Sequence, residues 1–145
     1  MATTIGWILG YVIFPGIGFV ASGFTVGIFQ WFVFKHLITK AWRWIIASSV
    51  GWAIGASIAV FLGSAESNIL TSIMVGIGTG ITQWFILRPE LQWAYWWIPI
   101  SLVSWTTGLT LVPGFLSTGA LAGAISGIAL VLLLPYPRKV GDDPT

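Results

Sequence analysis

The sequence predicts an all-α membrane protein, a polytopic bundle of six transmembrane helices arranged as three tandem helical hairpins. Hydrophobic residues make up 57% of the chain and charged residues only 7%, whereas a soluble domain carries about 25% charged residues. Uncharged stretches also exceed the length of about 18 residues that indicates a spanning helix; they cover 1–34, 44–65, 67–87 and 91–137. These stretches do not alternate apolar and polar residues as the strands of a membrane barrel do.

The first uncharged stretch predicts two helices, 1–14 and 19–34, joined at the Pro-Gly of "FPGIG" (14–18). The alternative is one tilted helix over 5–34, because 14 helical residues span only about 21 Å of a hydrocarbon core about 30 Å thick. This alternative gives a five-helix variant of the fold.

The other stretches predict four further helices. Stretches 44–65 and 67–87 each fit one span, and 91–137 breaks at "VPGF" into helices near 94–112 and 115–135. The hairpin in the last stretch has a tryptophan eight residues before its Pro-Gly, and so does the first stretch; the pairs are Trp7–Pro15 and Trp105–Pro113.

This spacing favours six helices over five. It predicts one transmembrane domain over 1–137, with hairpin repeats at about 1–35, 42–88 and 94–135, and a short polar tail over 138–145.

An internal repeat supports the hairpins. "GIFQWFVFK" at 27–35 returns as "GITQWFILR" at 80–88. Each copy belongs to a stripe of two glycines and a polar residue on one helix face, and such small residues let membrane helices pack closely. The stripes predict that the second helices of the three hairpins pack around a common axis. The predicted packing glycines are Gly23, Gly27, Gly76, Gly80, Gly119 and Gly123. The alternative is a glycine-lined pore, but no ring of charged or strongly polar residues accompanies the glycines.

The glutamines of the repeat, Gln30 and Gln83, are predicted to bond a neighbouring helix near the membrane boundary. The alternative is that their amides bind a ligand head group. The third repeat has Ser126 in the glutamine position, so a threefold ligand site would lack one amide. This substitution favours helix–helix bonding.

All six basic residues fall on one side of the six-helix model; they are Lys35, Lys40, Arg43, Arg88, Arg138 and Lys139. The positive-inside rule therefore predicts that both termini are cytoplasmic. Most of the ten tryptophans lie near these basic segments and form a predicted aromatic belt at the head-group level.

A few residues are candidates for binding a hydrophobic cofactor, although a structural role is favoured for each. Trp52 and Trp105 are predicted to lie deep in the hydrocarbon, where Ser48, Ser49 or Thr106 could accept an indole N–H bond. His36, the only histidine, could be an axial ligand to haem or chlorophyll, but a lone boundary histidine is more often simply exposed. The cofactor candidates are His36, Trp52, Trp105, Gln30 and Gln83.

Catalysis and ion transport find little support. The chain has no cysteine, no carboxylate pair and no metal-ligand cluster, and its predicted spans hold no ionisable residue that would mark an ion pathway. Glu66 and Glu90 are predicted on opposite sides of the membrane. A net charge of +2 indicates membrane orientation, and no nucleic-acid partner is expected.

The repeat resembles uncharacterised multi-helix membrane proteins that are frequent in cyanobacteria and some other bacteria. "GIGTGITQWFILR" with "WRWIIASSVGWAIG" carries the resemblance, the first repeat matches in part, and the third lacks both the glutamine and the following tryptophan. The resemblance implies a bacterial inner or thylakoid-type membrane and implies no activity or functional residue.

Three functions follow from these observations. The first is a non-enzymatic accessory or scaffold subunit of a membrane complex, or a homo-oligomer, with the lipid bilayer and other subunits or itself as partners. The alternative is a binding protein for carotenoid, chlorophyll or quinone in a photosynthetic or respiratory assembly. A second alternative is a passive channel for small solutes.

Overall fold

A computed structural model describes residues 3–5, 8–9, 18–38, 40–62, 68–111 and 115–135. Their secondary structure is helical, and no strand occurs among them. The described helices are α2 (Gly18–Phe34), α3 (Arg43–Phe61), α4 (Asn68–Leu87), the 3₁₀ helix η1 (Ala94–Trp96), α5 (Trp97–Thr110) and α6 (Phe115–Leu133).

These bounds agree with the predicted helices within a few residues at most ends. The largest difference is at α3, which ends at Phe61 where the sequence predicted 65. The prediction of one or two helices over 1–35 depends on residues 10–17, which lie outside the described part of the chain. The tail 138–145 lies outside it as well.

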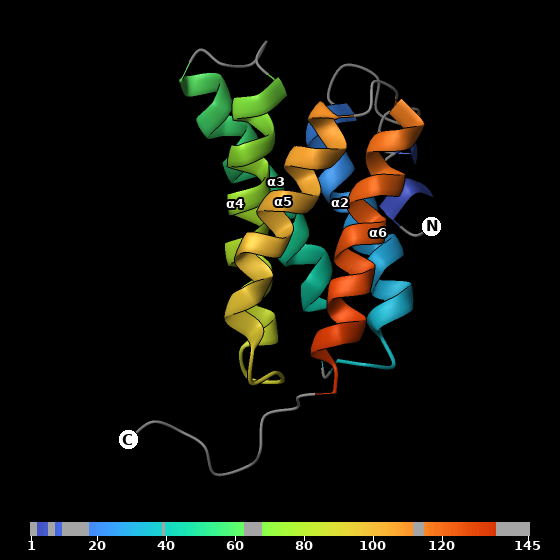
Figure 1. The fold of residues 1–145 in the computed structure, drawn as a ribbon. Coiled ribbons are helices and arrows are strands. Elements are labelled where there is room, and N and C mark those ends of the chain that lie inside the picture. The colour runs from blue at the N-terminus through green and yellow to red at the C-terminus, as the bar shows by residue number, and fades with distance from the viewer. Residues whose placement is uncertain are drawn as a thin grey trace.

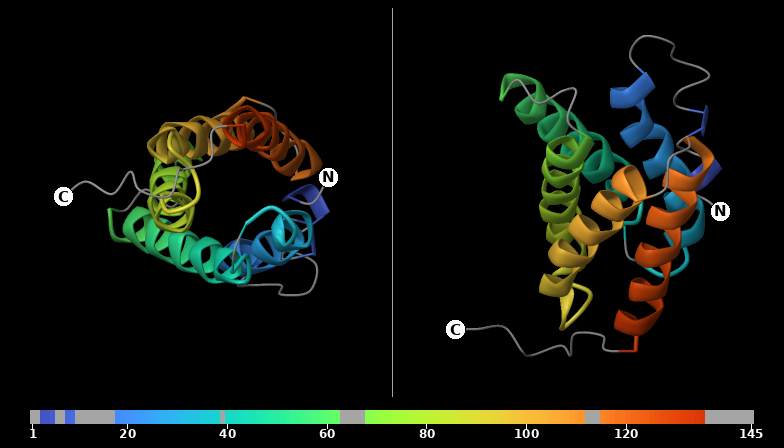
Figure 2. Two further views of the ribbon diagram at one scale, coloured as in Figure 1. Left: turned by 90° about the horizontal axis from the view of Figure 1, so that it is seen from below. Right: turned by 45° about the horizontal axis from the view of Figure 1, so that its top comes forward.

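The helices form a ring in which each helix packs on the next one along the chain (Figures 1 and 2). The N-terminal residues 3–5 complete the ring between α2 and α6. Gln30 of α2 donates a hydrogen bond from Nε2 to Thr3 Oγ1 over 3.1 Å. On the other side, a methyl group at Gly123 of α6 would lie 2.9 Å from Thr3 Cβ. Thr3 therefore lies between α2 and α6, the first and the last of the described long helices.

One end of the ring collects the basic connections. The α2–α3 and α4–α5 connections both lie at the lower end of Figure 1, where α6 also ends. They carry Lys35, Lys40 and Arg88, and Arg43 begins α3 at the same end. We call this the basic end. Arg138, Lys139 and Glu66 fall outside the described residues, so the full charge asymmetry stays a prediction.

Tryptophans fill the inside of the ring. Trp44 of α3 and Trp97 of α5 are 0% and 2% exposed, and their ring centroids lie 5.6 Å apart in an edge-on arrangement. Farther from the basic end, Trp52 and Trp105 meet in the same way at 4.9 Å. Helix α4 separates α3 from α5 around the ring, so these side chains meet across its interior. Among the described residues, indole rings thus pack the interior of the ring at these two levels.

Glycines mark the close contacts between helices. A methyl group at Gly27 would lie 3.0 Å from Ile45 Cα on α3, and one at Gly80 would lie 3.1 Å from Ile98 Cα on α5. Each of these stripes thus faces the first helix of the next hairpin. The prediction that the second helices of the hairpins pack around a common axis is therefore wrong for the described helices.

Within the described part of the chain, helix length supports two of the six predicted spans. Residues 43–61 and 69–87 are long and apolar enough to cross a membrane, whereas 22–34 and 118–133 are apolar but shorter. Helix α5 has 14 residues because η1 forms the first turn of that segment. A core helix of a soluble protein can meet the same length criterion, so a six-span bundle remains a proposal.

Candidate functional site

The first predicted glutamine joins three segments of the chain. Gln30 Oε1 accepts a 2.8 Å hydrogen bond from Trp44 Nε1 of α3, while Gln30 Nε2 donates to Thr3. We call Thr3–Gln30–Trp44 the first amide bridge. All three side chains are at least nine-tenths buried, so the bridge satisfies polar groups that would be costly to leave unpaired in the interior.

The second glutamine repeats this arrangement 53 residues later. Gln83 Oε1 accepts a 2.8 Å hydrogen bond from Trp97 Nε1 of α5, and its Nε2 donates to Ser48 Oγ of α3 over 3.0 Å. We call Ser48–Gln83–Trp97 the second amide bridge. In the second bridge one amide links α3, the other helix of its hairpin, to Trp97 at the start of α5. In the first bridge one amide links residues 3–5 to Trp44 near the start of α3. Both amides are used between helices and are not presented to a ligand.

The third repeat forms no equivalent bridge. Ser126 donates its hydroxyl to the Ala122 carbonyl of its own helix over 2.6 Å. Ser101 of α5, which stands 53 residues after Ser48, pairs with Thr79 of α4 at 3.0 Å. The described hydrogen bonds therefore leave α5 and α6 without a side-chain link at the basic end.

Structural contacts also occupy Trp52 and Trp105. They are 0% and 6% exposed and lie edge to face against each other, inside a cluster with Val26, Val75 and Ala122. Of the hydroxyls expected near their indole groups, Ser48 accepts from Gln83 and Ser49 donates to the Ile45 carbonyl. The two rings therefore pack the core and present no open surface to a cofactor.

His36 lies exposed in the turn after α2 at the basic end. Within the described residues, no group of three or more His, Asp or Glu side chains is placed to hold a metal ion. The structure thus separates His36 from the tryptophans and glutamines, and the five cofactor candidates do not form one site.

The basic end carries two matching clusters of a cation on aromatic rings. Lys35 Nζ lies 5.8 Å from the Trp31 ring and 5.5 Å from the Phe32 ring. The Arg88 guanidinium lies 5.6 Å from Trp84 and also over Phe85 at 5.1 Å. Such cation–π contacts suit the head-group level, where an indole and a basic side chain are both favoured.

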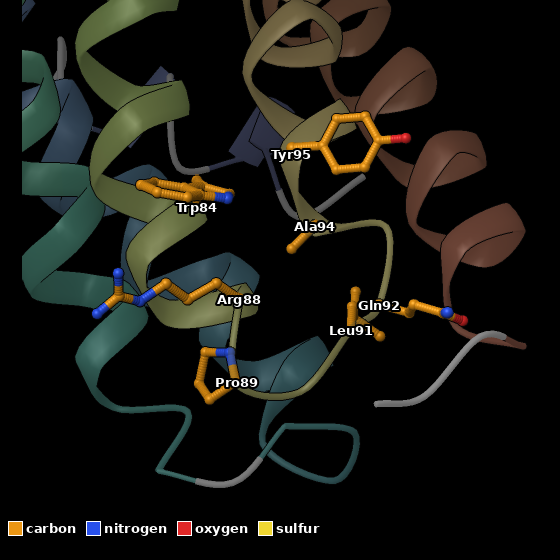
Figure 3. A pocket seen from close by; sticks show the side chains of 7 residues that line it. All are labelled: Trp84, Arg88, Pro89, Leu91, Gln92, Ala94 and Tyr95. Atoms are coloured by element: carbon orange, nitrogen blue, oxygen red, sulfur yellow. The ribbon is translucent and has the colours of Figure 1, made fainter. Parts of the chain in front are cut away.

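A hollow of about 460 Å³ lies beside the Arg88 cluster. Figure 3 shows Trp84 and Arg88 at the end of α4, with Tyr95 of η1 on the opposite side; the Arg88 guanidinium extends below Trp84, away from Gln92 and Tyr95. The remaining lining residues come from the connection and η1; they are Pro89, Leu91, Gln92 and Ala94. Its lining combines an arginine, an amide and a phenol with apolar side chains.

A second hollow, of about 470 Å³, is a groove between α5 and α6. Its lining is almost entirely apolar and includes Trp96, Ile100, Ile125, Ile128, Ala129 and Leu132. Figure 1 shows α5 and α6 diverging toward the basic end. The groove therefore lies on the hairpin that lacks an amide bridge.

Sequence reasoning missed both hollows. The equal spacing of 14 residues from Gln30 to Trp44 and from Gln83 to Trp97 was a signal for the bridges, because equal spacings indicate equivalent contacts. No comparable signal marked the hollows, which depend on how far two helices diverge.

Comparison of the chain with protein-family models, with curated proteins and with solved structures found no match to any of them.

Proposed function

We propose that this chain is a non-enzymatic integral membrane protein that acts as a structural subunit, associating through its outer surface with other membrane subunits or with copies of itself. The observation that carries the proposal is the distribution of side chains: the buried polar groups are uncharged hydroxyls and amides, and large apolar groups cover the outside of the ring as well as its core. Such an arrangement is unfavourable in water and favourable in lipid.

The buried polar side chains are almost all hydroxyls and amides that bond other helices or their own backbone. They include Ser48, Ser72, Thr79, Gln83, Ser101 and Ser104. The outer surface exposes large apolar side chains along every described helix, among them Phe24, Ile54, Ile58, Ile81, Val103 and Val131. Each apolar side chain left in water forgoes about 1.5–3 kcal/mol of burial, and large exposed apolar surface indicates a membrane or a protein partner.

Helix lengths are compatible with this location. Helix α2 has 17 residues, which is near the lower limit of about 17 for a spanning helix. Together, η1 and α5 cover 94–110 and measure about 27 Å at the rises of the two helix types. The tryptophan and cation clusters at the basic end suit the adjoining interface.

The packed interior favours a structural role over the alternatives. Trp44 and Trp97 meet across the axis together with apolar side chains from α2, α4 and α6, which opposes a solute path through the ring. The pairing of Trp52 with Trp105 leaves no open indole surface for a carotenoid, chlorophyll or quinone between them. Both observations support a protein that contacts its partners through the outer surface of the ring and not through its interior.

The test is expression followed by alkaline carbonate extraction of membranes and purification in a mild detergent. We expect the chain to stay in the membrane pellet and then to purify as a defined oligomer or with a stoichiometric partner. A chain released by carbonate would contradict the membrane location. A lone monomer in several gentle detergents would contradict the structural-subunit role, and a bound pigment or quinone would favour the cofactor alternative.

A further inference from the structure

The hollow beside Arg88 and the α5–α6 groove share η1 as a wall. Tyr95 lines the hollow and Trp96 lines the groove. Their ring centroids lie only 5.8 Å apart. A polar hollow at the basic end is thus adjacent to an apolar groove that runs along two helices.

The hollow has the chemistry of a head-group site. Arg88 is the one cation among its lining residues, and Figure 3 shows its guanidinium below Trp84, on the side away from the polar ends of Gln92 and Tyr95. An arginine guanidinium binds phosphate oxygens through charge-assisted hydrogen bonds. The hollow's volume of about 460 Å³ falls within the usual size of small-molecule sites, about 300–1,000 Å³.

The groove has the chemistry of a hydrocarbon site. Its lining residues are all aliphatic apart from Trp96, and Ile128 and Leu132 are 64% and 65% exposed. A polar molecule would gain no hydrogen bond there, whereas a hydrocarbon chain would cover these side chains.

We propose that the hollow and the groove together hold one anionic phospholipid, with its phosphate beside Arg88 and an acyl chain along the α5–α6 groove. The proposal rests on the membrane location proposed above. It commits to a phospholipid because the polar and apolar sites adjoin at η1 and because the charge of Arg88 complements a phosphate.

Lys35 provides a natural comparison for Arg88. It lies over Trp31 and Phe32 much as Arg88 lies over Trp84 and Phe85. Lys35 does not line the hollow. Removing either cation changes the net charge equally, so the two variants separate a specific site from general attraction to an anionic membrane.

Glu90 allows a substitution whose effect on phospholipid binding should be opposite to that of Arg88→Gln. It is half-buried two residues after Arg88 and is not among the lining residues. Its negative charge opposes that of a nearby phosphate. Glu90→Gln should therefore strengthen phospholipid binding, while Arg88→Gln weakens it.

The experiment is native mass spectrometry of the full chain in mild detergent, titrated with phosphatidylglycerol or with phosphatidylcholine of the same acyl chains. We expect phosphatidylglycerol to bind at least several-fold more tightly. Arg88→Gln should weaken its binding about tenfold, which corresponds to about 1.4 kcal/mol, and Lys35→Gln should leave it within about twofold.

Two further arms test the groove and the source of the phosphate. Ala129→Phe fills the groove and should weaken binding of both lipids, whereas Ala124→Phe, at an exposed position of the same helix, should weaken neither. Excess sn-glycerol 3-phosphate should not displace the lipid, because it carries the phosphate without the acyl chain.

Three outcomes would overturn the proposal: equal binding of the two lipids, equal effects of Arg88→Gln and Lys35→Gln, or displacement by glycerol phosphate. Circular dichroism of each variant shows whether lost binding reflects lost helix; if Arg88→Gln unfolds, Glu90→Gln decides by its opposite sign. A chain that resists carbonate extraction yet shows no lipid preference overturns this inference alone, whereas a chain released by carbonate overturns the proposed function.

Discussion

The hairpin of α3 and α4 is linked along its length, whereas the hairpin of α5 and α6 opens at its basic end. In the first hairpin, Gln83 bonds Ser48 and Thr82 donates to the Ala47 carbonyl over 2.7 Å. In the second, Gly108 lies against Thr118 far from the basic end, and the groove separates the two helices at the other end.

The difference follows one substitution within the repeat. Gln83 reaches both its own hairpin partner and Trp97, but Ser126 is shorter and bonds its own helix. A glutamine side chain can satisfy groups on two other helices at once, while a serine hydroxyl is satisfied locally. Of the two described hairpins, the one with glutamine in its stripe is thus closed, and the one with serine carries the apolar groove.

The largest effect is expected from the glycine crossing that holds the closed hairpin. A methyl group at Gly78 would collide with the Gly51 carbonyl oxygen, whereas one at Gly127 of α6 would meet nothing within 4 Å. Gly78→Ala should therefore lower the free energy of unfolding by about 3 kcal/mol, near the upper end of overpacking costs.

Gly127→Ala is the control and should leave the protein as stable or up to about 1 kcal/mol more stable, because alanine favours the helix. Unfolding in mixed detergent–SDS micelles, followed by circular dichroism, measures both variants. Equal stability of the two variants would contradict the close crossing of α3 and α4.

The next largest effect is expected from the second amide bridge. Gln83→Ala removes the acceptor of the Trp97 indole and the donor to Ser48, and it should cost about 1–3 kcal/mol. Gln30→Ala should cost a similar amount because it breaks the first bridge. Gln92→Ala, at an exposed position, is the control and should change the unfolding free energy by less than about 0.5 kcal/mol.

Much of this architecture could be predicted from the residues. The glutamine–tryptophan spacing indicated that Gln30 and Gln83 are equivalent, and the Pro-Gly break near 113 located the end of α5 and the start of α6. The direct Gln–Trp hydrogen bonds could not be predicted. Equal spacing indicates that the two glutamines make equivalent contacts, but it does not identify the side chain that each glutamine bonds. Ser48 was a predicted acceptor for a deep indole N–H, and in the structure it accepts a hydrogen bond from Gln83 instead.

The open hairpin of α5 and α6 also could not be predicted from the sequence. Ser126 identified a departure from the repeat, but a serine in a membrane helix is compatible with tight packing as well as with a gap. The groove depends on the divergence of α5 from α6, which approach closely at Gly108 and Thr118 and separate beside Trp96.

The third prediction concerns a substitution that should close the open hairpin of α5 and α6. Ser126→Gln should let the new amide reach toward α5 and draw α6 closer at the basic end. Because the natural chain has no cysteine, spin labels at Val103→Cys and Val131→Cys, both exposed, report the distance between the two helices. We expect a shorter mean distance in Ser126→Gln and an unchanged one in Ser126→Ala; a distance unaltered by Ser126→Gln would show that one amide is insufficient.

The smallest effect concerns the cation clusters. Lys35→Gln and Arg88→Gln should each lower the free energy of unfolding by less than about 1 kcal/mol, the range of exposed cation–π contacts. The two losses should agree closely because the ring distances are similar. Equilibrium unfolding with native mass spectrometry of the same samples would show whether the variants differ in lipid binding alone, as the proposed phospholipid site requires.

The most direct test of the amide bridges is a double-mutant cycle between Gln83 and Trp97. Trp97→Phe removes the indole N–H while it keeps an aromatic ring, and Gln83→Ala removes its acceptor. We predict a coupling energy of about 0.6–1.7 kcal/mol, which runs from the average to the largest value measured for hydrogen bonds between membrane helices. A coupling energy of zero for this pair, in variants that keep their helix content, would contradict the bridge that distinguishes the closed hairpin from the open one.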